Sequence, residues 1–136
     1  MTTIVQIRDD LAAVIDNISG WRTKAFLSEG VDAPVIKISR PAFDPRMVFQ
    51  QAKQVATFRA KAYVSRGTGE SGERQLEALA ELSGSGSLAA TVQTGSNWSV
   101  TVDYAQVTRI GEIELDLDTN AGAGYMTLTF DIEVVW

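Results

Sequence analysis

The most regular alternation of apolar and polar residues lies in the last quarter of the chain. From position 126 to 136 every even residue is apolar, and the odd residues are mostly Thr, Asp and Glu. From 112 to 118 the odd residues are apolar and all four even residues are acidic. The segment 119–124, Thr-Asn-Ala-Gly-Ala-Gly, has the composition of a turn. This pattern predicts a β-hairpin with one apolar and one acidic face.

The two runs also predict a register for this hairpin. If Asp118 lies opposite Tyr125, the apolar residues of the two strands face each other throughout, and Glu112 lies opposite Asp131. Like charges placed directly opposite destabilise a sheet by roughly 0.2–1 kcal/mol. The acidic face would then lower the stability of the sheet, and an isolated subunit would gain nothing in return.

Residues 3–18 have the spacing of an amphipathic helix, with apolar residues three and four positions apart. Thr3 and Gln6 form the pattern of a capping box. Gly20 follows the last apolar position and is suited to a left-handed C-terminal cap. We expect the apolar stripe of this helix to pack against a sheet.

Short apolar runs predict strands in the first half of the chain, at 21–27, 35–39 and 47–49. The segment 55–65 alternates cleanly, with Ala56, Phe58, Ala60, Ala62 and Val64 on one face. Because three of these side chains are alanines, we expect a helix to lie close above that strand.

The second half of the chain begins with a predicted helix over 73–82 and a Ser/Gly break at 83–87. Residues 88–92 fit a short helix or a turn, and the pattern does not decide between them. Residues 98–118 alternate, but the apolar phase changes at 106–107, which a strand accommodates only through a bulge, a bend or a turn. Gly111 is suited to that role.

These elements predict one α+β domain spanning residues 1–136. Its mixed or antiparallel sheet of about four to six strands packs against the N-terminal helix and a second short helix, and a C-terminal β-hairpin closes the sheet.

The composition of the chain excludes several classes of function. The chain carries a net charge of −5 and contains no Cys and no His, with a pI of about 4.6. Disulfides and thiolate chemistry are therefore excluded, and the usual general base and commonest metal ligand are missing. The long-range field disfavours diffuse binding to nucleic acid or anionic membranes. Neither a signal peptide nor an apolar run long enough to span a membrane is visible, so we expect a soluble intracellular protein.

Three motifs imitate chemical sites without their full pattern. Residues 67–72 match G-x-G-x-x-G, but Glu70 and Glu73 would repel a pyrophosphate, and no ribose-binding acid follows. Asp116-x-Asp118-x-Asn120 resembles the start of a calcium loop, which then lacks its glycine and its final glutamate. The in-register carboxylates have no visible substrate groove for glycoside hydrolysis. We therefore predict neither an enzyme nor a cofactor or metal site.

The acidic face remains to be explained. It is either a solvated outer surface, or a surface that faces a neighbouring subunit or a channel through which DNA slides. Basic residues on other segments are candidate counter-charges. The candidate residues for such an assembly interface or lumen are Glu112, Glu114, Asp116, Asp118, Asp131, Arg59, Lys61, Arg40 and Arg46.

The order of elements resembles a known family. The helix Arg8-Asp9-Asp10-Leu11-Ala12-Ala13 ends in Ile18-Ser19-Gly20-Trp21, and the Pro-punctuated stretch Ala33-Pro34 to Arg40-Pro41 follows. The strand 55–65, the loop and helix 66–82, and the closing Ile110-Gly111 to Val134-Val135-Trp136 complete the pattern. Over almost its whole length the chain resembles the tail terminator, or tail completion, proteins of long-tailed bacteriophages.

That resemblance implies a structural virion protein of the tail and neck, assembled in the host cytoplasm. Such subunits form a hexameric ring that caps the tail tube, stops its polymerisation and joins the tail to the head connector or stopper protein. DNA passes through the ring without sequence-specific binding, and neither a cofactor nor a membrane is involved. The alternatives are another neck or minor tail protein of the head-closure type, or a small ligand-binding α+β domain.

Overall fold

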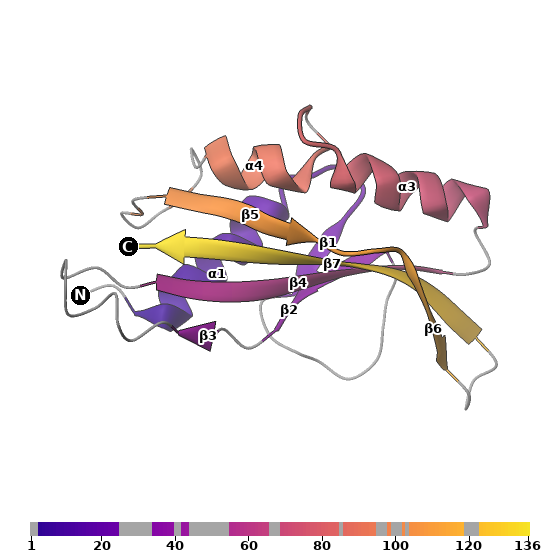
Figure 1. Ribbon diagram of the computed structural model, residues 1–136, viewed down its shortest axis with the longest axis horizontal. Coiled ribbons are helices and arrows are strands. Elements are labelled where there is room, and N and C mark those ends of the chain that lie inside the picture. The colour runs from indigo at the N-terminus through magenta and orange to yellow at the C-terminus, as the bar shows by residue number, and fades with distance from the viewer. Residues whose placement is uncertain are drawn as a thin grey trace.

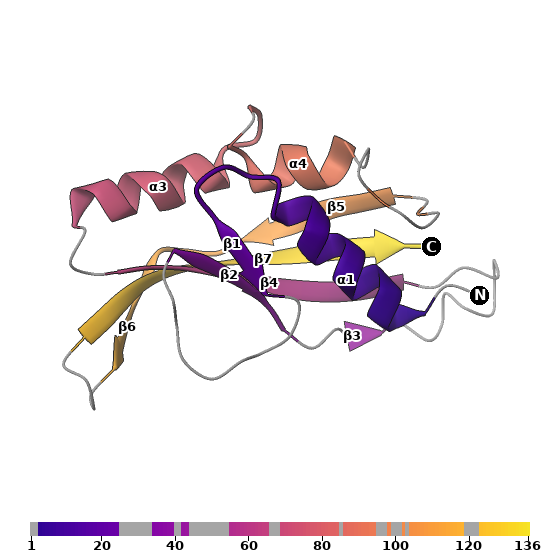
Figure 2. The ribbon, with the colours of Figure 1, turned by 180° about the vertical axis from the view of Figure 1, so that it is seen from behind.

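The structure is a computed structural model of the chain. It describes residues 3–24, 34–39, 42–43, 55–65, 69–84, 86–94, 98, 102, 104–118 and 123–136. The protein has the expected α+β architecture, a mixed sheet with helices on one face (Figures 1 and 2). Among the described residues no helix is long and apolar enough to cross a membrane.

The sheet contains seven strands within the described part of the chain, and its main path runs β1-β2-β4-β7-β5. Strands β1 and β2 are parallel, and the other pairs are antiparallel. Their bounds are β1 Arg22–Lys24, β2 Val35–Ile38, β3 Ala42–Phe43, β4 Val55–Ser65, β5 Tyr104–Ile110, β6 Glu114–Asp118 and β7 Ala123–Val135. The seven strands exceed the expected four to six because the two-residue β3 counts as a strand and the segment 98–118 contributes two.

Strand β7 is the centre of this arrangement. All eleven residues of β4 have partners in β7, from Val55 opposite Val135 to Ser65 opposite Tyr125. On its other side β7 pairs first with β6 and then with β5. The β6–β7 hairpin reaches beyond the helices and bends away from the sheet (Figure 1). We call the described part of this hairpin, residues 114–118 and 123–127, the arm.

Within the described residues three helices cover one face of the sheet: α1 Ile4–Ile15, α3 Glu70–Ala80 and α4 Leu88–Thr94. Figure 2 shows α1 lying across the sheet, with α3 and α4 along the β5 side. The core lies between the helices and the even-numbered residues of β4 and β7. Phe58, Phe130 and the alanines of β4 are fully buried there, which confirms that helices lie close above Ala56, Ala60 and Ala62.

The helix boundaries follow from local hydrogen bonds. The Gln6 backbone N–H donates to Thr3 Oγ1, and the Thr3 N–H donates to Gln6 Oε1, so the predicted capping box is confirmed. Helix α1 ends with its cap at Asp16, and Gly20, with φ of +89°, makes the turn into β1. The Arg8 Nη2 donates to the Ile38 carbonyl over 2.8 Å and ties α1 to β2.

Helices α3 and α4 in the second half of the chain differ in part from the predictions. Helix α3 begins at Glu70, three residues before the predicted start, with Gly69 as its N-cap. The undecided segment 88–92 is helical because the buried Ser87 caps it: Ser87 Oγ accepts from the Ala90 N–H and donates to the Glu81 carbonyl. The predicted strand 47–49 lies outside the described residues.

The change of apolar phase has the expected cause. The β5–β7 register shifts between Val107 and Arg109, which makes Thr108 an extra residue, as in a β-bulge. Residues 111–113 then interrupt the edge between β5 and β6, where the Gly111 N–H donates to the Thr129 carbonyl over 2.8 Å. Strand β5 begins at Tyr104; Trp98 and Val102 lie outside any strand, and the rest of the predicted strand start, 99–101 and 103, lies outside the described residues.

Candidate interaction face and sheet edge

The face of the sheet opposite the helices carries a row of three charges across its centre. Asp131 on β7 has Arg59 of β4 as its partner on one side and Arg109 of β5 on the other. The Arg59 Nε lies 3.1 Å from Asp131 Oδ1, and the side chains are 62% and 19% exposed. Arg59 is thus the ion-pair partner of Asp131, whereas Arg109 is its neighbour in the strand register only.

This row corrects the predicted hairpin register. Asp118 pairs with Ala123 and Glu114 with Thr127, two residues away from the predicted pairing. The connection is therefore 119–122, because Ala123 and Gly124 extend the ladder instead of forming the turn. A two-residue shift keeps every side chain on its face, so the two faces are as predicted. The predicted clash of Glu112 with Asp131 is wrong.

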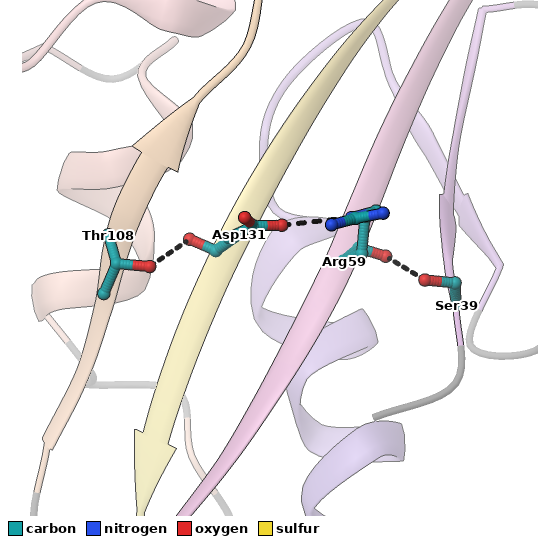
Figure 3. A network of polar contacts seen from close by, with 4 residues as sticks. All are labelled: Ser39, Arg59, Thr108 and Asp131. Carbon is teal, nitrogen blue, oxygen red and sulfur yellow. Dashed lines mark hydrogen bonds and ion pairs between the residues drawn. The ribbon is translucent and has the colours of Figure 1, made fainter. Parts of the chain in front are cut away.

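Figure 3 shows that the row belongs to a polar network running from the end of β2 to β5. The Ser39 Oγ donates to the Arg59 carbonyl over 3.1 Å, and Thr108 Oγ1 donates to the Asp131 carbonyl over 3.3 Å. The backbone at Arg59 and Asp131 is thus held by side chains from the neighbouring segments. This fixes where the two charged side chains leave the sheet.

An open hollow of about 590 Å³ lies over this row. Its lining contains two arginines and three carboxylates, so its formal charge is close to neutral. Arg109 is exposed and forms no hydrogen bond or ion pair with the rest of the described chain. The lining residues are Arg59, Arg109, Ile110, Gly111, Glu112, Glu114, Thr129 and Asp131.

The β2–β4 side of the open face is basic and aromatic. Lys61 lies opposite Lys37, and their Nζ atoms lie 5.4 Å and 5.7 Å from the centre of the Tyr63 ring. The Tyr63 and Tyr125 rings meet edge to face, with centroids 6.1 Å apart. Lys37 is almost fully buried. The sequence did not reveal that Lys37 lies beside Lys61 and Tyr63, because the run 35–38 is otherwise apolar.

The β6–β7 side of the open face is acidic. Asp131 and Glu133 point from β7, and Glu133 Oε1 accepts a hydrogen bond from the Tyr104 hydroxyl over 2.8 Å. Glu112 and Glu114 are exposed at the base of the arm. Apart from Arg109 on β5, the described basic groups of this face therefore lie on its β2–β4 side and the acidic groups on its β6–β7 side.

The arm also exposes an apolar side chain and a strand edge. Leu115 pairs with Met126 on the helix side of the hairpin, yet Leu115 is 61% exposed because the helices do not reach it. Strand β6 pairs with β7 on one side, and its other edge has no strand partner among the described residues. The arm thus presents an apolar side chain, carboxylates and an unpaired strand edge together.

The edge of β5 was not identified from the sequence. Within the described chain no strand pairs with its outer side. A groove of about 540 Å³ runs along that edge, between β5 and the segment from the end of α3 to α4. Leu82, at the groove, is 77% exposed. The groove is lined by Leu82, Ala89, Gln93, Val107, Thr108, Arg109 and Ile110.

The structure brings some predicted site residues together and separates others. Arg59, Asp131, Glu112 and Glu114 line one hollow, whereas Lys61 lies beside Tyr63 on the same face. Asp116 and Asp118 lie on β6, opposite Tyr125 and Ala123. Arg40 and Arg46 lie outside the described residues.

Two of the chemical sites considered in the sequence can be compared with the described residues. Among them no three His, Cys, Asp or Glu side chains are grouped to hold a metal ion. In the described part of the G-x-G-x-x-G segment, Gly69 is the N-cap of α3 and the acids Glu70 and Glu73 occupy the first helical turn. Carboxylates at that position oppose the binding of a phosphate. Charge pairing and strand addition are what this face and edge are equipped to do.

Comparison with known proteins gives no match, either to a family model or to a curated sequence.

Proposed function

We propose that this protein is a structural subunit of a bacteriophage tail, of the tail terminator kind. Its ring would cap the end of the tail tube, stop polymerisation of the tube and join the tail to the head connector. The proposal starts from the resemblance in the order of elements: an N-terminal helix, a one-sided sheet, a strand-to-helix segment and a closing hairpin.

One structural observation carries the proposal furthest: each subunit presents two unlike association surfaces. The arm exposes Leu115 and carboxylates, whereas the β5 edge exposes Arg109 beside an apolar groove. Unlike surfaces associate head to tail, and head-to-tail contacts generate a ring when the rotation between subunits closes. A hexamer is the ring that the resemblance implies.

The proposed ring has three kinds of partner: the tail tube, the head connector or stopper protein, and the DNA that passes through it. The tail tube and the head connector or stopper protein would meet the two rims of the ring. The net charge of −5 disfavours tight binding of DNA phosphates, so DNA would pass through the ring without sequence-specific binding. No cofactor takes part in this function.

The test is to image the purified protein by electron microscopy, with and without isolated tail tubes, and to measure its mass in solution. We expect rings, tubes with capped ends, and tubes that no longer lengthen when tube protein is added. A protein that stays monomeric and leaves tube growth unchanged would overturn the proposal. Binding to isolated head connectors without binding to tubes would instead identify a head-closure subunit.

A further inference from the structure

We infer that strand β6 in the arm of one copy pairs with the free edge of β5 in the next copy, so that the acidic arm and the β5 groove form the contact between subunits. This inference rests on the proposed ring for its biological setting. It names the two surfaces that meet, and it places the acids of β6 at a subunit contact.

The backbone provides the first argument. Strands β5 and β6 both have unpaired outer edges within the described chain. An unpaired edge is a template for another strand, and proteins that keep such edges soluble usually blunt or cover them. Strand β6 has five residues and β5 has seven, so a β6 strand can pair along most of β5.

The two faces of β6 match the two sides of the β5 edge. Alternation places Glu114 on one face of β6 and Leu115 on the other. At the β5 edge, Arg109 lines both the hollow on the open face and the groove, whereas Leu82 and Val107 line the groove alone. A β6 strand added there would bring the Glu114 carboxylate to Arg109 and Leu115 to the groove. Main-chain pairing with pockets for alternate side chains is how strand addition achieves specificity.

Charge and exposure complete the argument. Arg109 has no ion-pair partner in the described chain, and a carboxylate from a neighbouring copy would supply one. Leu82 and Leu115 are the two most exposed large apolar side chains of the described residues, at 77% and 61%. The pairing would remove both from water.

The inferred contact is head-to-tail rather than two-fold. The arm bends away from the line of β5 in both views (Figures 1 and 2). A straight partner strand that follows β6 therefore does not continue along β5 of the same molecule. Each copy instead offers its arm to one neighbour and its β5 edge to another, which is the arrangement a ring requires.

The chain contains no Cys, so single cysteines give a clean test. The variants Leu82→Cys and Leu115→Cys are mixed and oxidised, both in solution and on tail tubes. Both positions are exposed, so the substitutions should leave the fold intact. We expect a disulfide-linked dimer containing one copy of each variant. Val5→Cys on α1, whose native side chain is 50% exposed, is the matched control and should give no mixed dimer with Leu115→Cys.

Charge reversal gives a second, reversible readout. We expect Arg109→Glu and Glu114→Arg each to weaken self-association by about tenfold or more, since each places like charges opposite one another across the interface. Combining both changes in one chain should restore association. Glu77→Arg, at an exposed position on α3, is the control and should have no effect.

The outcomes separate this inference from the proposed function. Rings that form on tubes without the mixed disulfide, or that tolerate both charge reversals, would overturn the β6–β5 contact and leave the tail function standing. A mixed disulfide in a protein that ignores tubes would support the contact and overturn the tail function. A protein that never self-associates would overturn both.

Discussion

Arg59 and Asp131 face each other across the two longest strands of the sheet, with the Arg59 Nε 3.1 Å from Asp131 Oδ1. Arg109 lies opposite the same aspartate on its other side. Asp131, which the predicted register placed opposite Glu112, therefore forms an ion pair with Arg59 and has Arg109 as its other register neighbour.

The first prediction concerns that row. A double-mutant cycle with Arg59→Ala and Asp131→Ala should give a coupling free energy of roughly 0.2–1 kcal/mol, because the arginine side chain is largely exposed and the pair is screened by solvent. Urea unfolding followed by circular dichroism measures it. Repeating the cycle in 1 M salt should reduce the coupling, and a coupling that survives high salt unchanged would contradict a screened ion pair.

The second prediction concerns the small residues of β4. Ala60 is fully buried beneath the helices, so Ala60→Leu should lower the free energy of unfolding by about 1–3 kcal/mol through overpacking. The measurement is chemical denaturation of the purified variant. Lys61→Leu is the matched control on the opposite face and should cost less. Equal effects at the two positions would contradict the one-sided packing.

The third prediction concerns the cap of α4. Ser87→Ala should lower the free energy of unfolding by about 0.5–2 kcal/mol, because it removes the acceptor for the Ala90 N–H and the donor to the Glu81 carbonyl. Thermal unfolding of the variant measures the loss. Ser83→Ala, at an exposed position four residues earlier, should leave stability nearly unchanged.

The fourth prediction concerns the acids at the base of the arm and on β6. Replacing Glu112, Glu114 and Asp116 with their amides should change the free energy of unfolding by less than about 0.5 kcal/mol, as is usual for surface positions. The gain in stability expected from relieving a Glu112–Asp131 clash disappears with the corrected register. Ring assembly and tube capping, followed by electron microscopy, should weaken. Unchanged assembly would remove the acidic residues from the proposed function.

Local patterns predicted most of the fold. The capping box at Thr3, the buried face of the strand 55–65 and the two faces of the hairpin all follow from short-range chemistry, and the structure confirms them. The bulge near Thr108 was also visible as a change of apolar phase. These features are encoded within a few residues, where alternation and capping preferences act directly.

The features that the sequence did not reveal depend on which strands become neighbours. The Arg59–Asp131–Arg109 row requires β4 and β5 to flank β7, and no local pattern encodes that order. The predicted hairpin register was wrong by two residues because Ala123 and Gly124, whose composition suits a turn, are paired with β6 in the sheet. The β5 groove arises from α4 packing beside a strand distant from α3 in sequence. Only the cap at Ser87 carried a local signal that would have fixed α4.

The continuity of β7 has a mechanical consequence. One 13-residue strand forms part of the arm at one end and of the buried sheet at the other. A pull on the arm along β7 would load its ladder with the eleven residues of β4 in shear, so that many hydrogen bonds share the force at once. The arm can thus transmit tension directly into the core of the subunit, with no hinge in β7 between them.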